Sequence, residues 1–140
     1  HGKKMFSPST WLTERIVKDE VVCFLGYPGE LREFTDENMD LSLMVGVLNC
    51  TTVNERGFTI VDENNERKVY KFDQAIDTSN LKTLGGMSGT PVFTQRNGDF
   101  EIKGIIYESN DEGALSNIYC VHFDYIQKNG TIDRLKIPFV

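Results

Sequence analysis

The chain has 140 residues, of which 39% are hydrophobic and 11% aromatic, which is enough for one domain core and too little for two ordinary domains. A formal net charge of −6 without any cluster of Lys or Arg argues against binding to nucleic acids or anionic membranes, both of which need a basic face. No apolar run approaches the roughly 20 residues that span a bilayer, so the composition predicts one soluble folded domain.

The first 40 residues predict a connector, a buried strand and an exposed loop. Residues 9–17 mix turn formers with Trp11 and are interpreted as a connector with one or two helical turns. A continuous β-branched and aromatic run predicts a buried strand over 21–27, which Pro28-Gly29 ends in a turn. The acidic segment 31–40 has no periodicity and is expected to be an exposed loop.

Three further strands are predicted before the glycine-rich segment. Those over 41–53 and 57–62 are expected to pair through a turn-prone loop at Asn54-Glu55-Arg56. Residues 68–72 alternate between apolar and polar, which indicates a half-buried strand. A loop is expected over 73–83.

The last part of the chain predicts a hairpin and a closing strand. Segments 91–95 and 100–108 are joined by Asn97-Gly98, a pair that tight hairpins favour. An exposed loop over 110–113 then leads into a strand over 116–123.

A short helix is predicted near the end, with Asp124 capping residues 125–128 and Asn129-Gly130 ending it. The whole pattern therefore predicts an all-β fold, a closed barrel of six to seven antiparallel strands with a short C-terminal helix.

The segment Gly85-Gly86-Met87-Ser88-Gly89-Thr90-Pro91-Val92 surrounds one hydroxyl with three glycines. Glycine allows positive φ and close backbone approach, so we expect a loop that presents Ser88. The backbone N–H groups of Gly86 and Ser88 are then candidates to donate to a developing oxyanion. The alternative is a tight turn in which the serine is merely a small polar residue.

This segment resembles the nucleophile loop of the trypsin/chymotrypsin-like serine peptidases, in particular the bacterial branch with Gly-Met-Ser-Gly-x-Pro-Val. Three other segments fit the family in order: 23–29, 103–107 and 117–121. The resemblance covers about residues 21–127. It implies a Greek-key barrel, the second domain of such a peptidase, over 19–140, preceded by a connector or N-terminal extension over 1–18.

The resemblance also implies an activity. Ser88 would form an acyl-enzyme with a polypeptide substrate, Gly86 and Ser88 would supply the oxyanion hole, and no metal or cofactor would be needed. The substrate pocket would be walled by Tyr107, Glu108 and Ser109, with Asn117 opposite. Lys82, six residues before the serine, would lie at the pocket base and favour an acidic substrate side chain; the alternative is a solvated loop lysine.

Met87 differs from the residue that the digestive members of the family have at this position. Those members place an aspartate before the serine and pair it with a newly cut N-terminus, which a thioether cannot do. The loop is therefore expected to be held by packing instead. Cys23, Cys50 and Cys120 are widely spaced among apolar residues and are interpreted as core residues rather than metal ligands.

A serine hydroxyl needs an adjacent general base, and the chain contains only two histidines, His1 and His122. His122 lies in the predicted closing strand and is interpreted as structural, and His1 is terminal. The catalytic His and Asp are therefore expected on an N-terminal barrel outside this chain, which alone would be nearly inactive. The alternative is a non-catalytic relative that binds peptides or a protein partner by strand addition.

Two further expectations concern partners and compartment. An isolated second barrel would expose the face that a first barrel covers, so self-association through that apolar surface is expected. No signal peptide is visible in His1-Gly2-Lys3-Lys4, and the bacterial resemblance is compatible with either a cytoplasmic or an exported protein.

Overall fold

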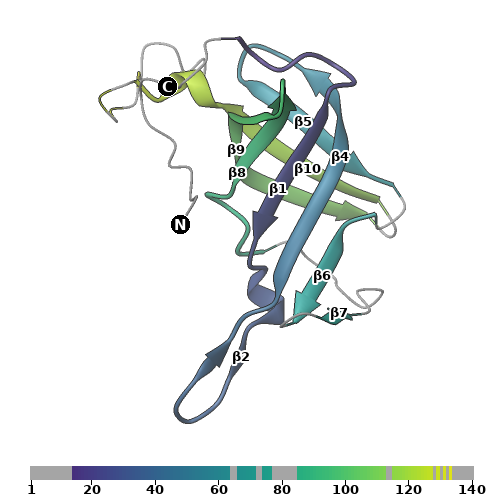
Figure 1. The fold of residues 1–140 in the computed structure, drawn as a ribbon, viewed down its shortest axis with the longest axis vertical. Helices are drawn as coiled ribbons and strands as arrows, with labels where there is room; N and C mark the ends of the chain where they lie inside the picture. The colour runs from purple at the N-terminus through teal and green to yellow at the C-terminus, as the bar shows by residue number, and fades with distance from the viewer. Residues whose placement is uncertain are drawn as a thin grey trace.

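The computed structural model describes residues 14–63, 66–71, 74–76, 85–112, 115–127, 129, 131 and 133. These residues form strands joined by turns, with two short 3₁₀ helices (Figure 1). The elements are β1 (Val21–Gly26), η2 (Gly29–Leu31), β2 (Glu33–Phe34), β3 (Met39–Asp40), β4 (Leu43–Val53), β5 (Gly57–Asp62), β6 (Lys68–Lys71), β7 (Gln74–Ile76), β8 (Pro91–Arg96), β9 (Asp99–Glu112), β10 (Leu115–His122) and η3 (Phe123–Tyr125).

Six of the strands close into an antiparallel barrel. Their spatial order is β1-β8-β9-β10-β5-β4, and β4 pairs back onto β1 to close the ring. Along the chain β1, β4 and β5 are successive neighbours, and the next barrel strand, β8, returns to lie beside β1. This is the Greek-key arrangement, so the predicted all-β Greek-key barrel is confirmed with six strands. β6 and β7 extend the sheet from β4.

The core fills the barrel because alternate residues of each strand point inward. Val22 and Phe24 of β1, Met44 of β4 and Ile118 of β10 are all fully buried. Burying one such side chain contributes about 1.5–3 kcal/mol. Gly46 lies opposite Phe24, and a Cβ there would lie 2.3 Å from the ring, so the missing side chain makes room for the aromatic one.

Three predicted loops are wrong in part. Segment 31–40 is exposed as expected but forms a hairpin, β2–β3, whose turn is closed by a Thr35 N–H to Asn38 O bond of 2.8 Å. Segment 73–83 contains β7, and its residues 77–83 lie outside the described part. Segment 110–113 is strand up to Glu112, because Leu115 pairs with Glu112 across the hairpin. Ladder hydrogen bonds need no apolar side chains, so hydrophobic periodicity misses such strands.

The helix predicted over 125–128 is also wrong for residues 125–127, and residue 128 lies outside the described part. The chain makes a 3₁₀ helix at Phe123–Tyr125 instead, with His122 at its N-cap and no side-chain cap bond. Asp124 does not cap it, because its carboxylate accepts from Arg15 Nε at 2.9 Å. The Tyr125 ring is buried and its hydroxyl donates to Glu55 O, which fixes this turn onto the β4–β5 hairpin. The predicted connector over 9–17 lies outside the described residues up to residue 13.

Candidate functional site

The glycine-rich segment forms a turn at the rim of the barrel, between the start of β8 and the middle of β9. Thr90 N–H donates to Met87 O at 3.0 Å, which puts Ser88 and Gly89 at the centre of a β-turn. Gly89 has φ +92°, the left-handed value that the third position of a type II turn requires. Gly89 N–H donates to Ile106 O at 2.8 Å, so the turn is fixed to β9, and Ser88 is exposed.

Met87 anchors this turn in the core. Its side chain is only 1% exposed, and it lies so close to Gly26 that a Cβ there would be 2.6 Å from the methionine Cε. The residue before Ser88 therefore points into the barrel while Ser88 stands at the surface. Met87 therefore holds the loop by packing, since its uncharged thioether cannot form an ion pair.

Gly86 is held against the loop that follows β1. Gly29 N–H donates to Gly85 O at 2.6 Å, and Gly86 has φ +89°. A Cβ on Gly86 would lie 2.7 Å from Gly29 N and 3.2 Å from Arg32 Nη2. Among the described residues, the N–H groups of Gly86 and Ser88 donate to no protein acceptor. In the described part of the chain, these two backbone donors are thus without an acceptor, and only Met87 separates the two residues.

The Ser88 hydroxyl donates to Tyr107 O at 3.1 Å. Tyr107 is the extra residue of a β-bulge in β9, because Tyr119 pairs with Glu108 and Cys120 pairs with Ile106. Bulges reorient a strand locally and are frequent next to active sites. A carbonyl oxygen is a hydrogen-bond acceptor but no proton acceptor at neutral pH, so this contact orients the hydroxyl without activating it.

The predicted pocket residues lie on the strands next to this turn. Tyr107 is 53% exposed, Glu108 is exposed, and Ser109 is half-buried. Asn117 is half-buried on β10, where it pairs with Asn110. Lys82 lies outside the described residues. The structure thus brings Tyr107 to Ser88 and puts Glu108, Ser109 and Asn117 farther along the β9–β10 ladder.

Next to Ser88, one side of β9 has no strand partner among the described residues. The ladder between β8 and β9 ends at Pro91 and Ile105, whereas β9 continues beside β10. Within the described sheet, Tyr107–Ser109 therefore has a strand neighbour on one side only. The Tyr107 ring lies near that of Tyr119, with centroids 6.4 Å apart, and burial raises the pKa of the Tyr107 phenol. Among the described residues no strand pairs with this edge, and strand addition needs such an edge.

His122 lies in a different environment. It is 1% exposed, its Nε2 lies 2.8 Å from Asn54 O, and its ring packs near Phe58 and Tyr125 with centroids 5.9 and 6.4 Å away. Burial lowers the pKa of the imidazole. All these neighbours belong to the β4–β5 hairpin and η3, and the structural interpretation of His122 agrees with them.

The sequence did not assign Gly29 or Arg32 to the site. Their position next to Gly86 depends on how the barrel closes, which no local pattern predicts. In the part of the chain that the structure describes, no group of His, Cys, Asp and Glu is arranged to hold a metal ion, and no helix is both long and apolar enough to cross a membrane. No protein-family model, curated protein or solved structure matched the chain. The candidate site is therefore interpreted from its own geometry.

Proposed function

We propose that this chain is the serine-bearing barrel of a trypsin-like serine endopeptidase, with Ser88 as the nucleophile. The observation that carries the proposal is the turn itself. An exposed serine lies between two positive-φ glycines. The N–H groups of Gly86 and Ser88, which have no acceptor among the described residues, belong to the residues on either side of a buried methionine. The closed Greek-key barrel agrees with the same family resemblance.

In this proposal Ser88 Oγ attacks the carbonyl carbon of a peptide bond and loses its proton to a histidine. The carbonyl oxygen becomes an oxyanion that accepts from the N–H groups of Gly86 and Ser88. Loss of one such donor typically costs about 3 kcal/mol of transition-state stabilisation. The tetrahedral intermediate then expels the amine, which takes the proton from the histidine, and water hydrolyses the acyl-enzyme by the same steps.

The base has to come from outside the described residues, because His122 is buried against Asn54, Phe58 and Tyr125. In the proposal a first barrel contributes the His and Asp. The outer face of β1 and β4 offers a surface for it, since Val21, Leu25 and Val47 are 54%, 49% and 59% exposed. When that barrel docks, Ser88 exchanges the Tyr107 carbonyl for the imidazole as its hydrogen-bond acceptor.

The open edge of β9 gives the substrate a backbone partner. A peptide added beside Tyr107–Ser109 would run past Ser88 and place one carbonyl at the turn, while side-chain selection would fall to the pocket residues that the family resemblance implies, Lys82 and Asn117 among them. Main-chain pairing of this kind tolerates many sequences, and pockets for individual side chains provide the specificity.

The test uses a fluorophosphonate probe on the natural protein that contains this chain. We expect the unmodified protein to be labelled and the Ser88→Ala variant to remain unlabelled. Thr52→Ala removes an exposed hydroxyl elsewhere on the barrel and should be labelled like the unmodified protein. Equal labelling of the Ser88→Ala variant, or no labelling of the unmodified protein, would refute the peptidase assignment.

A second function, peptide binding without cleavage, is favoured by one observation. Among the described residues no base reaches Ser88, and the open edge of β9 needs none to capture a strand. The natural coding sequence upstream of this chain distinguishes the two proposed functions. A Thr-Ala-x-His-like segment followed by an Asp-Leu/Ile-Ala-like strand supports the peptidase, and a natural protein without them supports the binder.

A further inference from the structure

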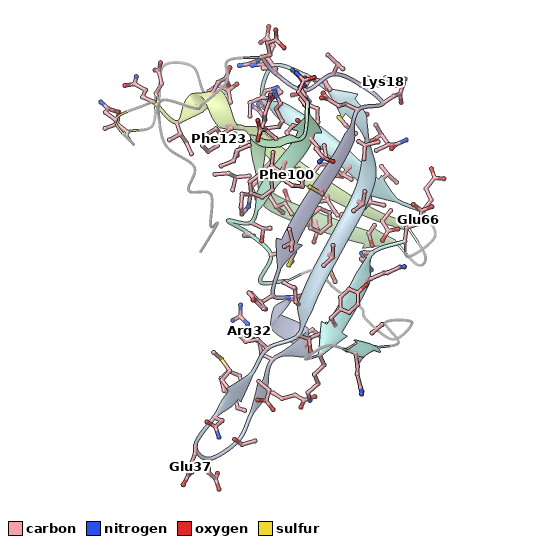
Figure 2. All side chains as sticks on the ribbon, in the orientation of Figure 1. Lys18, Arg32, Glu37, Glu66, Phe100 and Phe123 are labelled. Carbon is pink, nitrogen blue, oxygen red and sulfur yellow. The ribbon has the colours of Figure 1, made fainter. Side chains whose placement is uncertain are left out.

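The hairpin of β2 and β3 projects away from the barrel (Figure 1). Arg32 lies near the point where the hairpin leaves the barrel and Glu37 lies at its far tip (Figure 2). Glu33 pairs with Asp40 and Phe34 pairs with Met39 in a sheet of two strands. The hairpin therefore adds no strand to the barrel.

The hairpin exposes two large apolar side chains in one place. Phe34 is 74% exposed and Met39 is 51% exposed, and the two residues face each other across the strands. Side chains directly opposite in an antiparallel pair lie about 5 Å apart at Cβ, so they form one contact surface. Aromatic residues and methionine are enriched in protein interfaces relative to the rest of the surface.

The hairpin is also built to keep its shape without a third strand. At the turn, Thr35 N–H donates to Asn38 O, and Asn38 N–H donates to Thr35 Oγ1 at 3.1 Å. Near the base, Lys71 Nζ lies 2.5 Å from Glu33 Oε2, which ties the hairpin to β6. An isolated two-stranded hairpin is marginal in water. These bonds order the apolar pair in advance, which lowers the entropy cost of binding a partner.

The charge around the apolar pair selects the partner. Asp36 and Glu37 lie in the turn, and neither forms an ion pair with any described residue. A basic surface would therefore complement the tip. A second copy of this chain carries the same net charge of −6, which disfavours it as the partner of this acidic tip, and an anionic membrane is disfavoured for the same reason.

From these observations we propose that the β2–β3 hairpin is a docking element for a protein partner. Phe34 and Met39 insert into an apolar pocket, and Asp36 and Glu37 meet Lys or Arg side chains on its rim. The proposal is independent of the chemistry at Ser88, since it concerns a different surface and a non-covalent contact.

The test begins with a random-peptide display library selected on the unmodified protein and counter-selected on a Phe34→Ser, Met39→Ser double variant. We expect enriched peptides that combine aromatic or large aliphatic residues with Lys or Arg. One enriched peptide is then synthesised with a fluorophore and titrated by anisotropy. Phe34→Ser and Met39→Ser should each weaken binding at least about tenfold, as hot-spot truncations do.

Two further variants separate the apolar and charged contributions. Asp36→Asn with Glu37→Gln should weaken binding at low salt and much less at high salt, because salt screens exposed charges. Phe100→Ser removes an apolar side chain with 53% exposure from the β8–β9 hairpin, which has no role in either proposal, and should bind like the unmodified protein. Circular dichroism melts of all variants check that the barrel stays folded, and the exposed positions of the substitutions make a similar melting temperature the expected result.

Several results would overturn the proposal. These are no enrichment over the double variant, enriched peptides without basic residues, or an equal loss of affinity in Phe100→Ser. A dimer in light scattering that disappears in the double variant would show that a second copy is the occupant. Hairpin-dependent sedimentation with phosphatidylcholine vesicles would show that the occupant is a lipid surface.

Discussion

The contact between Gly86 and Gly29 can be tested with two matched glycine substitutions. Gly86→Ala places a Cβ at φ +89° and 2.7 Å from the Gly29 backbone nitrogen, with Gly29 Cα at 3.0 Å. Gly89→Ala places a Cβ at φ +92° in open space, with nothing within 4 Å. Both residues lie in the glycine-rich segment and have nearly the same positive φ, so the contact with the Gly29 loop is the main difference between them.

The expected loss of stability has two contributions, the left-handed backbone conformation and the steric contact with the Gly29 loop. A left-handed conformation costs an alanine about 1–2 kcal/mol, which is the whole effect expected for Gly89→Ala. In Gly86→Ala the colliding atoms belong to the backbone, so the Gly29 loop has to shift, at a further cost of about 1–3 kcal/mol. We therefore expect Gly86→Ala to destabilise the domain by about 2–5 kcal/mol in total.

Urea unfolding followed by far-ultraviolet circular dichroism measures both variants. Gly98→Ala, at φ +83° with nothing within 4 Å, provides a control in a distant turn and should behave like Gly89→Ala. The slopes of the unfolding free energy against urea should be equal, so that the midpoints report stability. If Gly86→Ala destabilises the domain no more than Gly89→Ala does, the loop after β1 does not brace the turn and the reasoning fails.

Two more predictions concern titratable groups. Burial lowers the pKa of His122 below its ordinary 6.5, against a raising contribution from the Asn54 carbonyl and, more weakly, opposite contributions from Arg15 and Asp124. The unfolded chain then binds more protons in acid, so the free energy of unfolding should fall from about pH 7 to about pH 5; an unchanged pH slope in His122→Gln would contradict this. Burial raises the pKa of all three thiols, that of Cys50 to about 11, but Cys50 and Cys120 are also buried away from the reagent. Only Cys23, which is half-buried, should react with Ellman's reagent in the folded protein, and a native-state reaction that persists in Cys23→Ser would refute this.

The sequence by itself determined the features that a short stretch of chain encodes. Hydrophobic runs and alternation located β1, β4, β5, β6, β8 and β10 to within a few residues, and Asn97-Gly98 forms its turn with φ +52° and +83°. The glycines around Ser88 predicted an exposed turn with unusual backbone angles, and Gly86 and Gly89 have them. These features depend on local periodicity and on the steric freedom of single residues, which are present before the chain folds.

Only the tertiary structure decided which of these pieces meet. Closure of β4 onto β1 brings Gly29 to Gly85, the bulge in β9 turns the Tyr107 carbonyl toward Ser88, and His122 is buried beside Asn54. The β2–β3 hairpin and the polar end of β9 depend on backbone pairing, which leaves no hydrophobic period in the sequence. Contacts between residues far apart along the chain are set by barrel closure and by strand register, and no local pattern carries that information.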